Sequence, residues 1–289
     1  MITSLTFKQQ SNYEGFPKAA ELIEIEGAHA LEASDRAMFN QLLQTAHDSG
    51  RRAAHRTGCG VGNFTRGTAP RLDKAREQRS HPGQSARLRR TEVRVTYVSP
   101  RTGLSRTKET QLLEFTDTDD SDSPSATVQF GIPKRLRIGL ARANRWERIR
   151  CEIAYAMSSK YAIALYEMIC LRANLERCVE TINMGKFCKL LGVPPGAYDR
   201  ADNFMRNVIA PALVEVNGLS DLGVEIEMVR KHSGAPAHAV AITWWRKQPD
   251  EFRAAMLERS RPRVGRMARL KGQAEPVVTQ FEISGVPQV

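Results

Sequence analysis

The sequence has little cysteine, and no two cysteines are spaced for metal binding or redox chemistry. The five cysteines form an odd set without any Cys-x-x-Cys pair: Cys59, Cys151, Cys170, Cys178 and Cys188. This spacing supports neither a disulfide framework nor a structural zinc site. We therefore expect no metal and no cofactor, and we expect the last three cysteines to be small core or surface residues.

Long apolar runs are also missing. No stretch approaches the roughly 18 apolar residues that cross a bilayer. The first residues, Met1 to Lys8, lack the charged start and apolar middle of a signal peptide. The sequence therefore predicts a cytoplasmic protein with no membrane partner.

Motifs for catalysis are absent as well. The chain contains no GxxxxGK[ST] loop and no GxGxxG following a strand, and its six histidines show neither HxH nor HExxH spacing. Four aspartates between Asp117 and Asp122 follow one another along the chain, which favours a hydrated loop over a metal site. We expect no catalytic residue and no enzyme activity.

What the chain does have is positive charge. Lys and Arg number 43 against 32 Asp and Glu, which gives a net charge of +11. Apolar residues make up 41% of the chain, enough for a packed core. A basic excess on a folded protein favours a polyanionic partner, with nucleic acid ahead of an anionic membrane, because bound phosphates release counterions.

Residues 51–89 differ in composition from the rest of the chain. Together with Arg90 they hold eleven Lys or Arg against only Asp73 and Glu77, and they contain few large apolar residues. Glycine, proline, histidine and serine are scattered there without a helical or strand period. Such a segment buries too little apolar surface to offset its ordering entropy, so we expect loop or disorder.

Residues before 158 give a mixed pattern. A helix is predicted from a cap at Ser34 to Gly50, with Met38, Leu42, Leu43 and Ala46 on one side. Alternating apolar residues predict strands over 21–26, from 93 to 97, around 113–115 and from 128 to 132. A short basic helix is expected over 134–143.

The pattern after Ser158 is more regular. Helices are predicted over 158–175, 183–192 and 201–217, and strands over 224–228 and 240–244, joined by a hairpin tip at 230–236. Three helices followed by a hairpin are the order of a winged helix, which is a helix-turn-helix with a two-stranded wing. A short helix over 250–258 and a basic flexible end should complete the chain.

The third of these helices has two different sides. A wheel of 100° per residue places Phe204, Val208, Ala212 and Val216 on a broad apolar face. Asn203, Arg206 and Asn207 fall on the opposite face, together with the small Ala210. Arginine binds guanine and asparagine binds adenine with paired hydrogen bonds, so this face suits base readout in DNA. An ordinary solvated helix face would look the same.

Pro211 lies within this helix. It should kink the helix, because it cannot donate to the carbonyl of Asn207; alternatively, it begins a new turn after a break.

Other polar residues near this helix are candidates for DNA contact. The candidates for contact with phosphates are Lys186 and Lys189 on the second helix, Tyr198 and Arg200 before the third, and Arg230, Lys231 and His232 at the hairpin tip.

Several spaced strings resemble the second winged helix of iteron-binding plasmid replication initiators. They are Ser158-Ser-Lys-Tyr-Ala-Ile-Ala-Leu-Tyr-Glu-Met168, Phe187-Cys-Lys-Leu-Leu-Gly192, Tyr198, Asp202-Asn-Phe-Met-Arg206, Pro211-Ala-Leu-Val-Glu-Val-Asn217, Ser220-Asp221, Val224-Glu-Ile-Glu227 and the strand through Trp244. The resemblance covers 158–245 well. It extends more weakly over 20–50 and 91–157.

The resemblance implies an α+β protein with two winged-helix domains, binding of repeated origin sites in double-stranded DNA, and a homodimer that represses the initiator's own gene. It also implies origin opening and recruitment of the host initiator and the replicative helicase. We accordingly predict an N-terminal extension over 1–19, a first winged-helix domain over 20–150, a second over 151–247 and a basic tail over 248–289. The first domain should be incomplete or disordered over 51–89, where the sequence departs from the family.

Two other functions share part of this pattern. A winged-helix transcriptional repressor with no role in replication would use the same DNA contacts. An origin-nicking protein is a third class, although it would need clustered histidines or carboxylates that the chain lacks. Direct repeats near the gene favour an initiator, and a single inverted repeat over the promoter favours a repressor.

Overall fold

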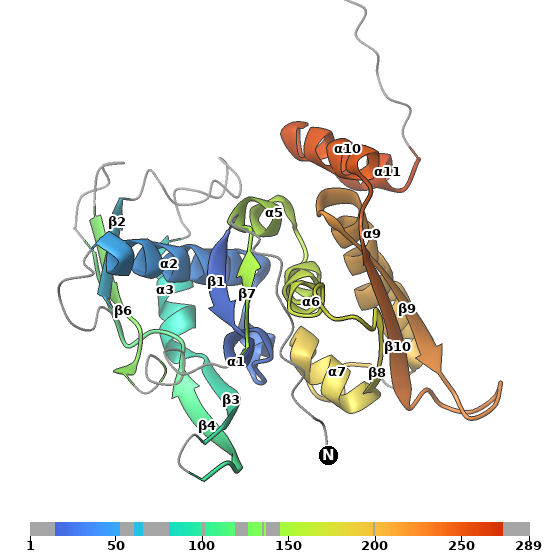
Figure 1. The fold of residues 1–289 in the computed structure, drawn as a ribbon, viewed down its shortest axis with the longest axis horizontal. Helices are drawn as coiled ribbons and strands as arrows, with labels where there is room; N and C mark the ends of the chain where they lie inside the picture. Colours follow the sequence, from blue (N-terminus) through green and yellow to red (C-terminus); the bar gives the residue numbers. More distant parts are fainter. Residues whose placement is uncertain are drawn as a thin grey trace, which may run out of the picture.

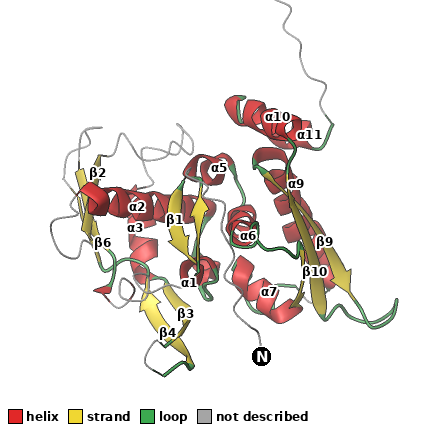
Figure 2. Cartoon of the chain, in the orientation of Figure 1, coloured by secondary structure: helices red, strands yellow, loops and turns green. Residues whose placement is uncertain are grey.

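The computed structural model of the chain describes residues 15–52, 61–65, 81–99, 102–118, 127–134, 136, 145–198 and 200–273. Helices and strands are mixed along the chain, and the described residues form four small sheets (Figures 1 and 2). The fold is therefore α+β, as predicted. No helix in the described part of the chain is both long and apolar enough to span a membrane.

The first half is built around one long helix. Its helices are α1 (Ala20–Ile23), α2 (Ala33–Arg52) and α3 (His81–Arg90), with a 3₁₀ turn at Ala28–Ala30. Three antiparallel sheets accompany them: β1 (Phe16–Ala19) with β7 (Trp146–Ile149); β2 (Val61–Thr65), β6 (Thr127–Gly131) and β5 (Phe115–Thr118); and the hairpin of β3 (Glu92–Val98) and β4 (Ser105–Gln111).

Helix α2 confirms the predicted helix beginning near Ser34. Its predicted stripe, Met38, Leu42, Leu43 and Ala46, is buried in the core. Strand β3 likewise confirms the alternation predicted from residue 93, because Val93 and Val95 point inward and their neighbours along the strand are exposed.

The strand predicted over 21–26 is wrong. Leu22 and Ile23 lie in the helical turn α1 and are both buried, whereas a strand with one exposed face would bury only one of two sequence neighbours. Strand-like pairing is limited to a single bridge between Glu26 and Arg94. Alternation over six residues was too short a pattern to separate a strand from one helical turn.

The expectation of loop or disorder over 51–89 is also wrong in part. Helix α2 extends to Arg52, and β2 and α3 lie within the segment. Helix α3 forms because Leu88 is fully buried and Arg87 binds the buried Asp35 through two hydrogen bonds of 2.8 and 2.9 Å. These partners are distant in sequence, so composition alone did not reveal them. Residues 53–60 and 66–80 lie outside the described residues.

Two other predicted segments lie partly outside the described residues. Residues 16–19, predicted as part of an N-terminal extension, form β1 and pair with β7, whereas 1–14 lie outside the description. Most of the helix predicted over 134–143 lies outside it as well. The strand predicted around 113–115 is β5, which begins at Phe115 after the buried Leu113.

The second half has the predicted order of three helices and a hairpin. Helix α5 (Cys151–Ala156) leads into α6 (Lys160–Cys170), α7 (Met184–Leu191) and a long helical segment. That segment comprises α8 (Ala201–Phe204), a π-helical turn (Met205–Ile209) and α9 (Ala210–Leu219). The hairpin is β9 (Leu222–Val229) and β10 (Ala239–Arg246), and β8 (Val179–Asn183) joins it on the far side of β10.

Helices α6 and α7 of the second half begin at side chains that cap them. Ser159 accepts hydrogen bonds from the backbone N–H groups of Tyr161 and Ala162. Asn183 caps α7 in the same way, and Gly192 ends it in the left-handed conformation, with φ of 73°. Strand β8 was not predicted, because only Ile182 is buried along it and it shows no alternation.

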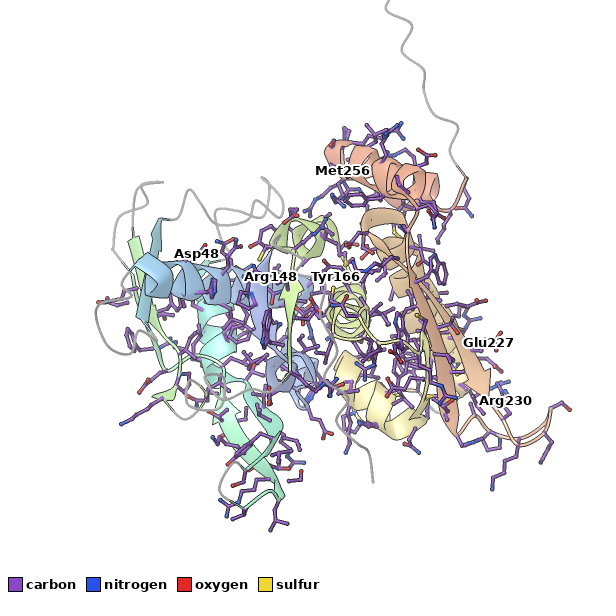
Figure 3. The ribbon with its side chains drawn as sticks, in the orientation of Figure 1. Asp48, Arg148, Tyr166, Glu227, Arg230 and Met256 are labelled. Atoms are coloured by element: carbon purple, nitrogen blue, oxygen red, sulfur yellow. The ribbon has the colours of Figure 1, made fainter. Side chains whose placement is uncertain are left out.

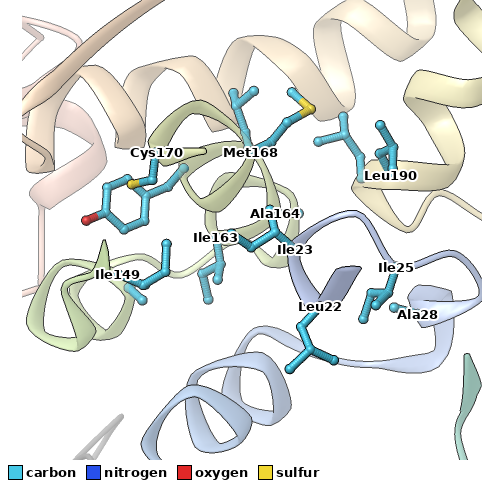
Figure 4. Close-up of a cluster of buried hydrophobic side chains, with 14 of the residues drawn as sticks. Leu22, Ile23, Ile25, Ala28, Ile149, Ile163, Ala164, Met168, Cys170 and Leu190 are labelled. Carbon is cyan, nitrogen blue, oxygen red and sulfur yellow. The ribbon is translucent and has the colours of Figure 1, made fainter. Parts of the chain in front are cut away.

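The two halves share one hydrophobic core. Leu22, Ile23 and Ile25 from the first half pack near Ile163 and Ala164 of α6 (Figure 4). A buried polar cluster accompanies them: Lys18 Nζ lies 2.8 Å from both Glu167 Oε2 and Asn40 Oδ1, and Asn40 Nδ2 donates to Glu167 Oε1 over 2.6 Å. Burial lowers the pKa of Lys18, and Glu167 opposes that shift.

Two short helices follow the hairpin. Helix α10 (Pro249–Ser260) confirms the helix predicted over 250–258, and α11 (Arg266–Leu270) lies in the stretch predicted as flexible. Glu258 is buried against Arg266 and Arg269, and Arg266 also donates to the carbonyl of Ala156 over 2.9 Å. This pair of helices therefore contacts the C-terminal end of α5. Residues 274–289 lie outside the described residues.

Candidate nucleic-acid interface

The helical segment 201–219 is held by its apolar side. Phe204, Val208, Ile209, Ala212 and Val216 are all buried, as the wheel predicted. The ring of Phe204 packs edge-on against Phe187, with centroids 6.2 Å apart, and lies 5.8 Å from the ring of Tyr198. These contacts fix the segment against α7 and leave its other side to solvent.

The opposite side carries the three polar residues predicted for base readout. Asn203, Arg206 and Asn207, here called the reading face, are exposed, and so is the small Ala210 beside them. Arg206 Nη2 donates to Asn203 Oδ1 over 3.1 Å. The structure therefore brings these side chains together on one exposed surface, as the sequence predicted.

Pro211 does not break the segment. The structure places a π-helical turn just before it, in which the N–H of Ala210 bonds the carbonyl of Met205. Pro211 then occupies the first turn of α9, where a missing N–H costs least. This placement fits the interpretation that Pro211 begins a new turn, and the kink stays a prediction.

Arg230 lies where β9 runs into the wing loop (Figure 3). Its Nη2 is 2.8 Å from Asp202 Oδ1 at the start of α8, and its Nη1 donates to the carbonyl of Ala235 over 2.9 Å. The guanidinium therefore ties the wing loop to the reading segment. Lys231 and His232 are exposed in the loop beyond it. Sequence reasoning missed Asp202, because no local pattern links positions 28 residues apart.

An open cleft of about 780 Å³ lies between α7, the turn at 194–198, α8 and the wing loop. Four predicted contact residues line it: Lys189, Tyr198, Arg200 and Arg230. Cys188 also lines the cleft, and burial raises the pKa of its thiol, which keeps it protonated at neutral pH. Within the described ranges, no cluster of three or more His, Cys, Asp or Glu is placed to hold a metal ion.

The lysines of α7 differ in their surroundings. Lys186 is exposed near the start of the helix. Lys189 is also exposed, but its Nζ lies 3.5 Å from Glu26 Oε2 of the first half. Lys189 is therefore placed at the junction of the two halves, which the sequence did not indicate.

The first half presents a second hairpin on the same side of the molecule. In Figure 1, the β3–β4 hairpin and the β9–β10 hairpin both project beyond the body toward the lower edge of the view. Arg94 and Arg106 are exposed on the first hairpin, and Arg94 Nε lies 2.9 Å from Glu109 Oε1. Sequence reasoning predicted strand β3 but did not select these cations.

Comparisons with known proteins agree with this architecture. Residues 183–244 match the family model described as "Initiator Rep protein, WH2", a span that holds α7, the reading segment and the wing. This is a family of replication initiators, in agreement with the expectation that the chain is no enzyme. No curated protein matches the chain in sequence.

A solved structure with a similar fold is titled "Crystal structure of Pi initiator protein in complex with iteron DNA". The match has a TM-score of 0.58 and 12% sequence identity, and it covers 82% of this chain and 100% of that one. It supports the predicted α+β architecture across both halves.

Proposed function

Because residues 183–244 match the family model described as "Initiator Rep protein, WH2", we propose that this chain is a plasmid replication initiator that binds double-stranded origin DNA. One observation carries the proposal. Asn203, Arg206 and Asn207 are exposed together on a helix whose opposite side is buried in the core. A rigid helix with such a face is what enters a major groove.

The reading face supplies the base contacts in this proposal. The Arg206 guanidinium binds the O6 and N7 atoms of a guanine, and the amides of Asn203 and Asn207 bind adenines. Arg206 exchanges its hydrogen bond with Asn203 for the base when DNA is present. Exposed Ala210 lets the helix backbone approach the groove closely.

Phosphates are bound around this helix. Lys186, Lys189, Arg200, Lys231 and His232 contact the DNA backbone from the second helix, the segment start and the wing, and Tyr198 lies beside them. Arg230 shares this role with its task of holding the wing loop at Asp202 and Ala235. The net charge of +11 supports backbone binding by the chain as a whole.

The first half adds a second contact in this proposal. Its β3–β4 hairpin projects on the same side as the wing, so a single DNA segment meets both (Figure 1). The solved structure of similar fold contains Pi initiator protein with iteron DNA, which favours repeated origin sites as the target here. Origin opening, recruitment of the host initiator and replicative helicase, and a homodimer belong to the same proposal through the family resemblance.

Footprinting on the DNA that flanks the chain's own gene tests the proposal. We expect protection of several direct repeats by the wild type and loss of that protection by Arg206→Ala. Arg253→Ala is the matched control, because Arg253 is exposed on α10. Protection of one inverted repeat over the promoter would instead indicate a repressor, strand cleavage would indicate a nicking protein, and no specific protection would overturn the proposal.

A further inference from the structure

We propose that the π-helical turn at 205–209, kept open by Pro211, sets the direction of the reading face, and that Pro211 is therefore a positioning residue for base recognition. The inference rests on the proposed function of the reading face. It goes further by assigning base preference to a residue whose own side chain carries no hydrogen-bonding group.

Proline disfavours a continuous α-helix at position 211. In an α-helix the N–H of residue 211 would bond the carbonyl of Asn207, and Pro211 has no N–H. The ring of a proline also clashes with the carbonyl four residues before it. Continuing the α-helix through Pro211 is therefore unfavourable, and opening the preceding turn relieves the clash.

The preceding turn is open in the structure. Ala210 bonds Met205, five residues earlier, instead of Arg206. A π-helical turn contains about one residue more than an α-helical turn, so the helix before it is offset in rotation by up to about 100° relative to a continuous α-helix. Isolated π turns of this kind are frequent at functional sites.

Separate contacts hold the two ends of the segment. Phe204, just before the π turn, is packed against Phe187 and Tyr198. Glu215, well after it, is buried and accepts hydrogen bonds of 3.0 Å from the backbone N–H groups of Ser158 and Ser159 at the start of α6. Each end is thus fixed in rotation, and the π turn accommodates the offset between them.

The reading face lies where this offset acts. Arg206 and Asn207 are inside the π turn, and Asn203 is two residues before it. A return to α-helical geometry would rotate these side chains relative to Glu215 and the core. Helix α7 and strands β9 and β10, which belong to the elements that contribute phosphate contacts in the proposed function, would stay in place, whereas the ion pair between Asp202 and Arg230 would break.

The first experiment measures base preference. Pro211→Ala restores an N–H, and a randomised-site selection compares its preference with that of the wild type. We expect at least a fivefold loss of discrimination at the base pairs that depend on Arg206 and Asn207, with affinity for random DNA within twofold. Pro249→Ala is the control, because Pro249 opens α10 and is exposed. Equal discrimination by Pro211→Ala and wild type would overturn the inference.

The second experiment needs no DNA. Scalar couplings across hydrogen bonds in the free protein should join the Ala210 N–H to the Met205 carbonyl in the wild type, and to the Arg206 carbonyl in Pro211→Ala. Absence of the Met205 coupling from the wild type would overturn the inference, and so would its persistence in Pro211→Ala. If Pro211→Ala does not fold, Pro211→Ser supplies the same N–H and is judged by both criteria.

The two proposals fail in different ways. A wild type without base discrimination overturns the proposed function and this inference together. A wild type that discriminates, with a Pro211→Ala variant that discriminates equally well, overturns only the positioning role of Pro211.

Discussion

Each half of the molecule places a helix directly before an antiparallel hairpin. In the first half α3 ends at Arg90 and β3 begins at Glu92; in the second, α9 ends at Leu219 and β9 begins at Leu222. The arrangement is the same, but the two helices are attached to the core differently. Helix α3 buries one large apolar side chain, Leu88, whereas the segment 201–219 buries a full apolar side.

The difference shows what each helix can offer to a partner. Arg87 of α3 donates two hydrogen bonds to Asp35 of α2, so this arginine attaches α3 to α2. The second-half segment is held by Phe204, Val208 and their apolar neighbours, so its reading face is exposed to solvent. Hydrophobic attachment leaves Asn203, Arg206 and Asn207 available for bases, which is why we assign base readout to the second half.

The largest expected effect is on the apolar attachment. Phe204→Ala removes a buried ring from between Phe187 and Tyr198 and should lower the free energy of unfolding by about 3–5 kcal/mol. Urea denaturation followed by tryptophan fluorescence measures the loss, because Trp244 is buried in the same half. Phe252→Ala, on the half-buried ring of α10, should cost clearly less. Equal losses would contradict the importance given to Phe204.

A smaller effect is expected on the ionic attachment. Among the described residues, Arg87→Ala leaves the buried carboxylate of Asp35 with the N–H of Glu32, at 2.8 Å, as its one partner, and should cost about 1–3 kcal/mol of stability. Amide hydrogen exchange should show faster exchange in α3 and unchanged exchange in α9. Arg89→Ala removes an exposed arginine from the same helix and is the control. Unchanged protection of α3 in Arg87→Ala would mean that Leu88 alone holds the helix.

The reading face should respond in binding and not in folding. Arg206→Ala should weaken specific DNA binding by about 1–3 kcal/mol and relax preference at one base pair. Its melting temperature should stay near that of the wild type, because Arg206 is exposed and bonds only Asn203 among the described side chains. Titrations against specific and random DNA measure the two affinities. Equal losses on both would show that Arg206 contacts only phosphate.

The smallest effect concerns the wing. Lys231→Ala should weaken binding to all sequences alike and reduce the slope of log K against log salt by about one unit, as expected for one lost phosphate contact. Binding measured between low and physiological salt gives the slope. The same slope in the variant and the wild type would remove Lys231 from the interface, and the comparison between the halves would then rest on the reading face alone.

Local pattern was enough to predict much of the second half. The apolar side around Phe204 and Val208 and the exposure of Arg206 follow from residues three or four positions apart on a helix. The hairpin follows from alternation in β9 and β10. In the first half the same reasoning failed over 51–89, because α3 depends on a partner in α2, and Asp35 is 52 residues away from Arg87.

The sequence by itself determined the order of elements from Ser159 to Trp244, apart from β8, and the composition of the reading face, since helical and strand periods are local properties of the chain. Only the tertiary structure decided the partners: Asp202 for Arg230, Glu26 for Lys189, and Glu167 for Lys18. It also decided the π turn before Pro211, because contacts at both ends of the segment fix its rotation. Pairings between distant residues depend on how elements pack, and no spacing along the chain encodes them.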